Sequence, residues 1–190
     1  MGQTTRLFIA APLPDELKAY FVEQAGRYKS DALRQVPTEN LHLTLYFIGN
    51  VPASQLPAIQ DVTAHLTRQF TPFTLQLEAI EPGPKPRSPR LIWARFRSHD
   101  AFAQLSGSLT QALSTEPPLH REPKPHVTLA RFRKDRPVPH SLQSFYPDTP
   151  LALQVNEIAV WHSELGSPHP HYSILQRYPL TGNHAEGKTV

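Results

Sequence analysis

The sequence predicts an α+β fold built by duplication, and two observations support this. The expected order of elements up to residue 82 is strand, helix, strand, helix, strand, and after residue 90 it is strand, helix, strand and then two more strands. The second strand of each half also carries the same motif, His-x-Thr-Leu. A mixture of strands and helices also fits a parallel, doubly wound sheet. The repeated motif favours duplication.

Local patterns predict the elements of the first half. Pro14, Asp15 and Glu16 are typical of a helix start, since proline and acidic residues are favoured in the first turn. Gly49 closes a run of apolar residues typical of a strand, and Ser54 is a suitable cap for a helix with an apolar stripe. These patterns predict, in order, a strand at 6–12, a helix at 14–28, a strand at 41–48, a helix at 54–70 and a strand at 73–80.

The second half begins after a proline-rich segment. Residues 81–90 contain four prolines, one glycine and three cations (Lys85, Arg87 and Arg90), which predicts a loop or a linker between lobes. The patterns that follow predict a strand at 91–96, a helix at 100–113, a strand at 125–132, a short unassigned segment at 141–145, and strands at 151–161 and 172–180. We therefore expect one domain over 1–180, with lobes at roughly 1–82 and 90–180, and a disordered tail at 181–190.

The composition of the 190 residues excludes several classes of protein. Hydrophobic residues make up 39% of the chain and the mean hydropathy is −0.41, which is typical of a soluble globular protein. No apolar run approaches the roughly 20 residues of a membrane-spanning helix, and the run 7–13 is short and broken by Pro12, so we expect a cytoplasmic protein without a signal peptide. Because the chain has no Cys, disulfides, Cys-bound metals and thiol nucleophiles are excluded. The net charge of +3 suits a partner that carries phosphate.

The repeated motif is the main indication of function. It occurs at His42-Leu-Thr-Leu45 and His126-Val-Thr-Leu129, and a random order of this composition would give two or more copies with a probability of about 0.004. Alternate side chains of a strand share a face, so each His lies beside its Thr while the apolar residues face the other way. If the halves are related by a pseudo-two-fold axis, the two pairs converge on one cleft. Two imidazoles facing one substrate can act as acid and base near neutral pH.

These features resemble the two-histidine phosphoesterase superfamily, and within it the RNA 2′,3′-cyclic phosphodiesterases, which are also called 2′-5′ RNA ligases. The resemblance covers about 6–180 and includes the settings of both motifs (40–49 and 125–131) and the opening Arg6-Leu-Phe-Ile-Ala. It implies a bilobal α+β fold, in which two antiparallel sheets flank a central cleft and the helices lie outside. It also implies metal-independent opening of a cyclic phosphate to a 2′-phosphate.

By this analogy, His42 donates a proton to the leaving 3′ oxygen and His126 is the base that activates water. The symmetry of the motif leaves this order open. Thr44 and Thr128 are expected to hydrogen-bond the phosphate, and Arg131, at the family's Arg position, to offset its charge. In an ideal strand, however, Ala130 and not Arg131 shares the face of His126, so either a bulge or the strand end reorients Arg131, or it lies away from the substrate.

Two further groups of residues bear on the cleft. Tyr46 shares the face of His42 in an ideal strand and is expected to line the cleft or stack on a base, which would leave Phe47 in the core. His162, His169 and His171 are expected on a loop at the rim, because proline-rich loops rarely hold a metal by themselves. We expect no metal and no cofactor. Trp93 and Trp161 are expected to be packing residues.

The predicted function is hydrolysis of a terminal 2′,3′-cyclic phosphate, with RNA or a nucleotide bearing such an end as the partner and a monomer as the expected state. Three alternatives remain open: a 2′-5′ RNA ligase, an oligoadenylate-type phosphodiesterase, and a non-catalytic module that binds RNA ends. The chain has no phosphate-binding loop motif and no nucleophile-elbow motif, so nucleotide-dependent kinases and serine hydrolases are not supported.

Overall fold

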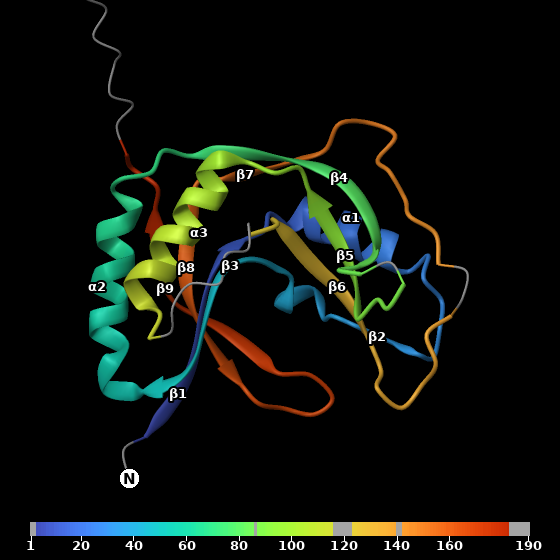
Figure 1. Cartoon of the computed structure of the whole chain (residues 1–190), viewed down its shortest axis with the longest axis horizontal. Coiled ribbons are helices and arrows are strands. Elements are labelled where there is room, and N and C mark those ends of the chain that lie inside the picture. Colours follow the sequence, from blue (N-terminus) through green and yellow to red (C-terminus); the bar gives the residue numbers. More distant parts are fainter. Residues whose placement is uncertain (1–2, 86, 116–122, 140–141, 183–190) are drawn as a thin grey trace, which may run out of the picture.

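Antiparallel strands between Thr4 and Pro179 form a curled sheet (Figure 1). The computed structural model describes residues 3–85, 87–115, 123–139 and 142–182. Within these residues the strand order is β7-β4-β5-β6-β3-β1-β8-β9, and β2 pairs with β6 beside this path. The strands are β1 (Thr4–Pro12), β2 (Leu33–Gln35), β3 (His42–Pro52), β4 (Phe73–Gly83), β5 (Leu91–Phe96), β6 (His126–Phe132), β7 (Ala152–Val155), β8 (Glu157–Glu164) and β9 (His171–Pro179).

The helices cover the sheet in two places. They are α1 (Asp15–Ala25), α2 (Leu56–Thr67) and α3 (Asp100–Leu113), with short 3-10 turns η1 (Thr38–Asn40) and η2 (Ala53–Gln55). Helices α2 and α3 lie side by side, with α3 against β3 and α2 against β8 and β9, whereas α1 packs against β6 (Figure 1). The longest helix in the described part of the chain is α3 with 14 residues, and none there is long and apolar enough to cross a membrane.

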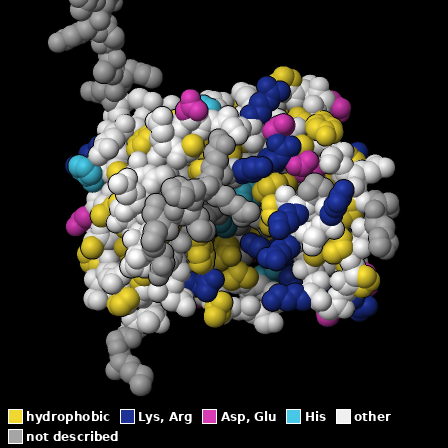
Figure 2. All heavy atoms as spheres, viewed as in Figure 1, with side chains coloured by type: hydrophobic (Ala, Val, Ile, Leu, Met, Phe, Trp, Pro, Cys, Tyr) yellow, Lys and Arg dark blue, Asp and Glu magenta, His cyan; other side chains and the backbone are white. Residues whose placement is uncertain are grey.

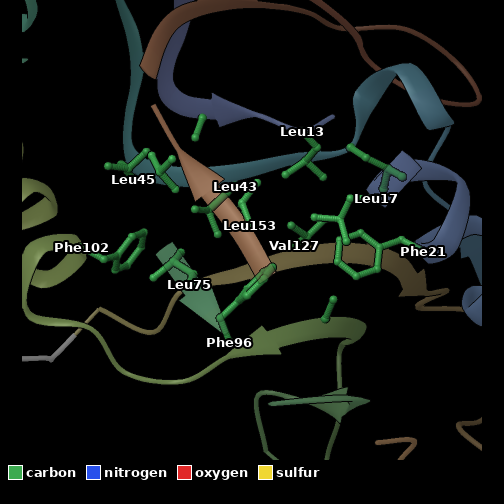
Figure 3. Close-up of a cluster of buried hydrophobic side chains, with 14 of the residues drawn as sticks. Leu13, Leu17, Phe21, Leu43, Leu45, Leu75, Phe96, Phe102, Val127 and Leu153 are labelled. Carbon is green, nitrogen blue, oxygen red and sulfur yellow. The ribbon is translucent and has the colours of Figure 1, made fainter. Parts of the chain in front are cut away.

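Alternation along the strands divides the buried side chains into two clusters. In β1, Leu7, Ile9 and Ala11 belong to the main core, while Phe8 and Ala10 belong to a smaller cluster with Trp161 on the opposite face. The main core also contains the middle residues of both His-x-Thr-Leu motifs, and Figure 3 shows them close to Leu153. The motif strands are therefore held against the core by their apolar residues.

Most predicted elements are present, and the α+β class with antiparallel pairing is confirmed. The helix at Asp100–Leu113 and the strand at Leu91–Phe96 have the predicted bounds. The proline-rich segment is the loop of a hairpin, because β4 continues to Gly83 and pairs with β5. The strand expected at 151–161 is divided at Asn156 into β7 and β8, and β2 was not predicted.

The strand pairing interleaves the two halves of the chain. β1 and β3 pair with each other, and β1 also pairs with β8, whereas β4 pairs with β5 and with β7. The division into lobes at 82 and 90 is therefore crossed by hydrogen-bonded ladders, and the duplicated two-lobed arrangement stays a prediction. In the predicted tail, the amides of Thr181 and Gly182 donate to Thr67 and Phe70, and residues 183–190 lie outside the described part. Of the segment expected at 141–145, residue 141 lies outside the described part, and Phe145 forms a bridge with Ile80.

Candidate active site

A single strand pair brings the two motifs together. β3 and β6 are antiparallel, and Leu43 pairs with Val127, so the middle residues of the motifs face each other. One residue to either side in this register, His42 lies opposite Thr128 and Thr44 lies opposite His126. Leu43 and Val127 are fully buried in the core, so the His and Thr side chains point to the other face of the sheet. An approximate two-fold axis through this pair exchanges the motifs.

A β-bulge lies at the last residue of each motif. Tyr46 pairs with Ile9 and Thr44 with Ala10, which leaves Leu45 without a partner in the β1–β3 ladder. In the β5–β6 ladder, Ala130 and Thr128 have partners and Leu129 has none. An extra residue of this kind shifts the alternation of side chains by one position. The residue five positions after each His, Phe47 in one copy and Arg131 in the other, therefore faces the cleft.

The bulges decide where two of the predicted site residues lie. Arg131 lines the cleft, as the bulge alternative of the prediction requires. The expected positions of Tyr46 and Phe47 are corrected, because Tyr46 packs against the main core and Phe47 lines the cleft with 50% of its surface exposed. Phe47 stacks against Phe8 at 6.4 Å between ring centroids, and the guanidinium of Arg6 lies 4.9 Å from its ring.

The cleft has a volume of about 190 Å³ and includes most of the predicted residues. His42, Thr44, Thr128 and Arg131 line it together with Phe8, Arg34, Asn40 and Tyr172. His126 lies next to this set, close enough that its charge lowers the pKa of His42. Figure 2 shows Lys and Arg side chains gathered along one side of a hollow in this face of the molecule.

Each catalytic candidate is oriented by a hydrogen bond to the backbone carbonyl two residues before it. Nδ1 of His42 lies 2.7 Å from the carbonyl oxygen of Asn40, and Nδ1 of His126 lies 2.8 Å from that of Lys124. A carbonyl oxygen only accepts hydrogen bonds, so Nδ1 carries the proton in each ring. In the neutral imidazole, Nε2 is then unprotonated and can accept a proton. In the charged imidazolium, Nε2 carries a proton and can donate it.

Aromatic rings pack against both imidazoles. The ring of His42 lies 4.7 Å from Phe8, 5.7 Å from Trp161 and 5.4 Å from Tyr172, and the ring of His126 lies 4.8 Å from Trp93. Trp161 is itself fixed, because its indole N–H donates to the carbonyl of Ala10 at 3.1 Å. The two tryptophans are buried, as packing residues are, and each packs on one of the histidines.

This environment holds both histidines in the neutral form. Burial lowers the pKa of His42 from 6.5 to about 4, with further contributions from the charges of Arg131 and His126 and an opposing one from the hydrogen bond to Asn40. Burial also lowers the pKa of His126, again with a contribution from Arg131. An anion bound in the cleft would offset these cations and raise both pKa values.

The β8–β9 loop forms one wall of the cleft. Pro168, His169 and Pro170 line it, and the loop is attached by two hydrogen bonds to the other wall. Arg34 Nη1 donates to the carbonyl of Pro168 at 2.9 Å, and Asn40 Nδ2 donates to that of Pro170 at 2.8 Å. Among the described residues, no group of three or more His, Cys, Asp or Glu side chains is arranged to hold a metal ion.

Phe8, Phe47 and Arg34 are among the cleft residues that sequence reasoning missed. Phe8 and Phe47 are apolar and fit a buried strand equally well, and Arg34 lies on a three-residue strand that has no distinct pattern. The bulge that turns Phe47 outward leaves no signal of its own in the sequence. The only indication available was the likeness between the motifs, since Phe47 and Arg131 are equivalent positions.

Comparisons with known proteins agree on the family. The family model of the 2′-5′ RNA ligase superfamily matches residues 13–167. An RNA 2′,3′-cyclic phosphodiesterase from Thermus thermophilus is 32% identical over 94% of this chain and 92% of its own, and one from Escherichia coli is 29% identical over 95% and 99%.

Solved structures give the same result. A crystal structure of the Thermus thermophilus protein TT0787 has a TM-score of 0.82 and 31% identity, and covers 94% of this chain and 100% of that one. Escherichia coli LigT complexed with 3′-AMP has a TM-score of 0.72 and 27% identity, and covers 94% and 99%. An antiparallel sheet that presents two His-x-Thr-Leu motifs to one cleft defines a class of two-histidine proteins. The chain belongs to the 2′-5′ RNA ligase superfamily.

Proposed function

We propose that this protein hydrolyses a terminal 2′,3′-cyclic phosphate of RNA to a 2′-phosphate. The observation that carries this proposal is the pairing of Leu43 with Val127, which places two imidazoles and two Thr hydroxyls on one face of the sheet. The relatives in Thermus thermophilus and Escherichia coli are named for this activity and match almost the whole chain. Arg131 adds a cation to the same cleft.

The reaction requires two proton transfers, which the histidines supply. A base removes a proton from water as the water oxygen attacks phosphorus, and the bond between phosphorus and the 3′ oxygen breaks as an acid protonates that oxygen. By analogy with the family, His126 Nε2 is the base and His42 Nε2 the acid. Thr44, Thr128 and Arg131 would donate hydrogen bonds to the non-bridging oxygens.

The order of acid and base is a separate question. The approximate two-fold axis makes the two histidines geometrically similar. Burial lowers the pKa of His42 to about 4, which favours its neutral form and hence the reverse order in the ligand-free protein. A substrate with sulfur in place of the 3′ oxygen has a leaving group that needs no protonation. It should restore turnover to the variant that lacks the acid, so rescue of His42→Ala and not of His126→Ala supports the family order, and the opposite result reverses it.

The remaining expectations complete this proposal. Phe47 lies where a base could stack on it beside the cleft. Two duplicated lobes that are interleaved through their strands, with sheets on either side of the cleft and helices outside, would put one motif on each side of the phosphate. We further propose a monomer that needs no cofactor, because the acid, the base and the cation are side chains of one chain. A cytoplasmic location is also proposed, since a chain without Cys suits a reducing compartment.

The family model also favours a second candidate, 2′-5′ RNA ligation. In that reaction the 5′ hydroxyl of another RNA takes the place of water, the same base removes its proton, and the 3′ oxygen leaves as before. The cleft chemistry is unchanged and only the attacking group differs. Product analysis separates the two, because ligation gives a 2′-5′ linkage and hydrolysis gives a terminal 2′-phosphate.

The test uses a short RNA that ends in a 2′,3′-cyclic phosphate, with and without chelator, and identifies the product by mass. We expect hydrolysis that survives chelation and that falls about 10²- to 10⁴-fold in His42→Ala and in His126→Ala. His162→Ala is the matched control, since this histidine lies on β8 and does not line the cleft. Undiminished turnover in both cleft variants would overturn the proposal. Tight binding of the RNA end without any turnover would favour a binding module.

A further inference from the structure

A second arginine lies directly across the sheet from Arg131. Arg34 on β2 pairs with Arg131 on β6, and both line the cleft. Directly paired residues of antiparallel strands point to the same face, with Cα atoms about 4.5–5.5 Å apart. Like charges in such a pair destabilise a sheet. The two cations therefore repel each other unless an anion lies between or beside them.

Within the described part of the chain, no carboxylate forms an ion pair with Arg34 or Arg131. By contrast, Arg95 on β5 pairs with two glutamates and Arg177 on β9 with one. The hydrogen bond of Arg34 to the carbonyl of Pro168 fixes its direction but brings no formal negative charge. Both guanidinium groups remain able to bind an anion.

The two arginines lie at the same level of β6, and the charge of Arg131 lowers the pKa of both histidines. The strand runs from His126 through Thr128 to Arg131, and its pairing with β2 involves only Ala130, Arg131 and Phe132. Both arginines thus lie at the end of β6 away from His126, and Arg34, on the neighbouring strand, is held beside the β8–β9 loop by its hydrogen bond to Pro168. A cyclic phosphate diester carries one negative charge, which Arg131 can offset. Arg34 is left for a second anion.

We propose that Arg34 binds the phosphodiester on the 5′ side of the terminal nucleotide, and so selects RNA chains over single nucleoside cyclic phosphates. This inference rests on the proposed function, since it concerns the same cleft. A nucleoside 2′,3′-cyclic phosphate has only the reacting phosphate, whereas a dinucleotide with the same end has one more. Arg34 is a specificity-determining residue for the longer substrate.

The test compares these two substrates in Arg34→Ala. For the dinucleotide we expect kcat/KM to fall about tenfold, mainly through KM, because a charge-assisted contact to a non-reacting phosphate is the same in the ground and transition states. For the nucleoside cyclic phosphate the change should stay within about twofold. Arg133→Ala is the matched control, since Arg133 is exposed, lies one residue beyond β6 and does not line the cleft.

Salt dependence distinguishes a bound phosphate from a merely structural role of Arg34 in holding the loop. Each phosphate neutralised on a single strand adds about −0.7 to the slope of log affinity against log salt. The slope for a dinucleotide that ends in a 2′-phosphate should therefore be less steep by up to about 0.7 in Arg34→Ala and unchanged in Arg34→Lys. A loop tether alone would leave the slope unchanged.

Other outcomes would overturn the inference. An equal loss with both substrates would place Arg34 at the reacting phosphate, and no loss with either would show that it binds neither. If the wild-type protein turns over neither substrate, the proposed function fails, and the binding measurements with the 2′-phosphate dinucleotide still decide the role of Arg34.

Discussion

At the scale of single residues, the surroundings of the two imidazoles make their pKa values sensitive to a bound anion. The backbone carbonyls of Asn40 and Lys124 hold each ring in one tautomer, and aromatic rings pack against both imidazoles. Burial disfavours the imidazolium, and Arg131 adds to this effect. The negative charge of a phosphate in the cleft would offset the charge of Arg131 and raise the pKa of both histidines. The substrate itself would therefore help to protonate the histidine that acts as the acid.

This balance predicts different pH optima for kcat/KM and kcat. The profile of kcat/KM reflects the free protein, where the pKa of His42 is about 4 and that of His126 lies below 6.5, and turnover needs one protonated and one neutral imidazole. Above these values both rings lose their protons, so we expect a bell-shaped profile with its maximum below pH 6.5. The optimum of kcat, which reflects the substrate complex, should lie at higher pH because the phosphate stabilises the imidazolium.

Unfolding measured at each pH is the control for this experiment. An unfolded histidine binds a proton below about pH 6.5, whereas folded His42 does so only near pH 4, so the free energy of unfolding should fall as the pH drops between these values. Rates are therefore compared only where the protein remains folded. A maximum of kcat/KM at pH 7 or above would contradict the assigned pKa directions.

Phe47 supports a second prediction at this scale. Its exposed ring lies on Phe8 at the edge of the cleft, and stacking of a base on an aromatic ring contributes about 1–3 kcal/mol. Phe47→Ala should raise KM for a dinucleotide substrate about tenfold with a smaller change in kcat, measured by steady-state kinetics. Tyr46→Phe is the control, because Tyr46 packs on the core and should leave KM unchanged. An unchanged KM in Phe47→Ala would exclude the stacking role.

At the scale of strands, the sequence predicted the motifs but not the turn of the side chains after them. His42, Thr44 and Thr128 lie where strand alternation and the duplicated motif place them. The positions of Phe47 and Arg131 depend on bulges at Leu45 and Leu129, which are set by register with β1 and β5. Register between distant strands is a tertiary property, so a single strand pattern does not contain it. Arg34 was missed for the same reason, since β2 exists only through its pairing with β6.

The contact between β4 and Trp93 gives a prediction for these elements. A Cβ at Gly83 would lie 2.4 Å from Cε2 of Trp93, whose ring packs on His126. Gly83→Ala should therefore displace the indole, lower the free energy of unfolding by about 1–3 kcal/mol and reduce turnover. Denaturant unfolding and initial rates measure the two effects.

Gly107→Ala is the matched control for the Gly83 variant. Gly107 lies within α3, and an added Cβ there meets no heavy atom within 4 Å. Alanine in a helix is favoured over glycine, so this variant should gain about 0.5–1 kcal/mol and keep full activity. If the Gly83 and Gly107 variants have equal stability and equal activity, the predicted displacement of the Trp93 indole and its effect on His126 are contradicted.

At the scale of the whole molecule, the strand order places the first strand of the chain between a strand from its middle and a strand from its C-terminal part. β1 lies between β3 and β8, and the C-terminal β9 pairs with the other edge of β8. The first and last strands therefore belong to one continuous sheet. The α+β class followed from the sequence because periodicity and loop signals are local. The interleaved pairing could not be predicted, because no local pattern indicates which edge of β1 pairs with the last strands.

This interleaving predicts that the two halves of the chain do not fold independently. A fragment of residues 1–87 lacks β5, β6 and β8, which are the partners of β4, β2 and β1. A fragment of residues 88–182 lacks β1 and β4, which are the partners of β8 and β5. Unpaired edges and exposed core residues should leave both fragments without a cooperative thermal transition by circular dichroism, whereas the full chain should show one.

The control separates loss of covalent linkage from loss of pairing. A protease site inserted between Arg87 and Ser88, both of which are exposed in the β4–β5 loop, allows the folded chain to be cut without removing any strand. The cut protein should keep its transition and its activity, because the ladders between the halves remain. A cooperative transition in either separate fragment would instead support contiguous lobes at 1–82 and 90–180. The two motifs would then meet by docking of two folded lobes, whereas in the interleaved chain the cleft and the fold form in the same step.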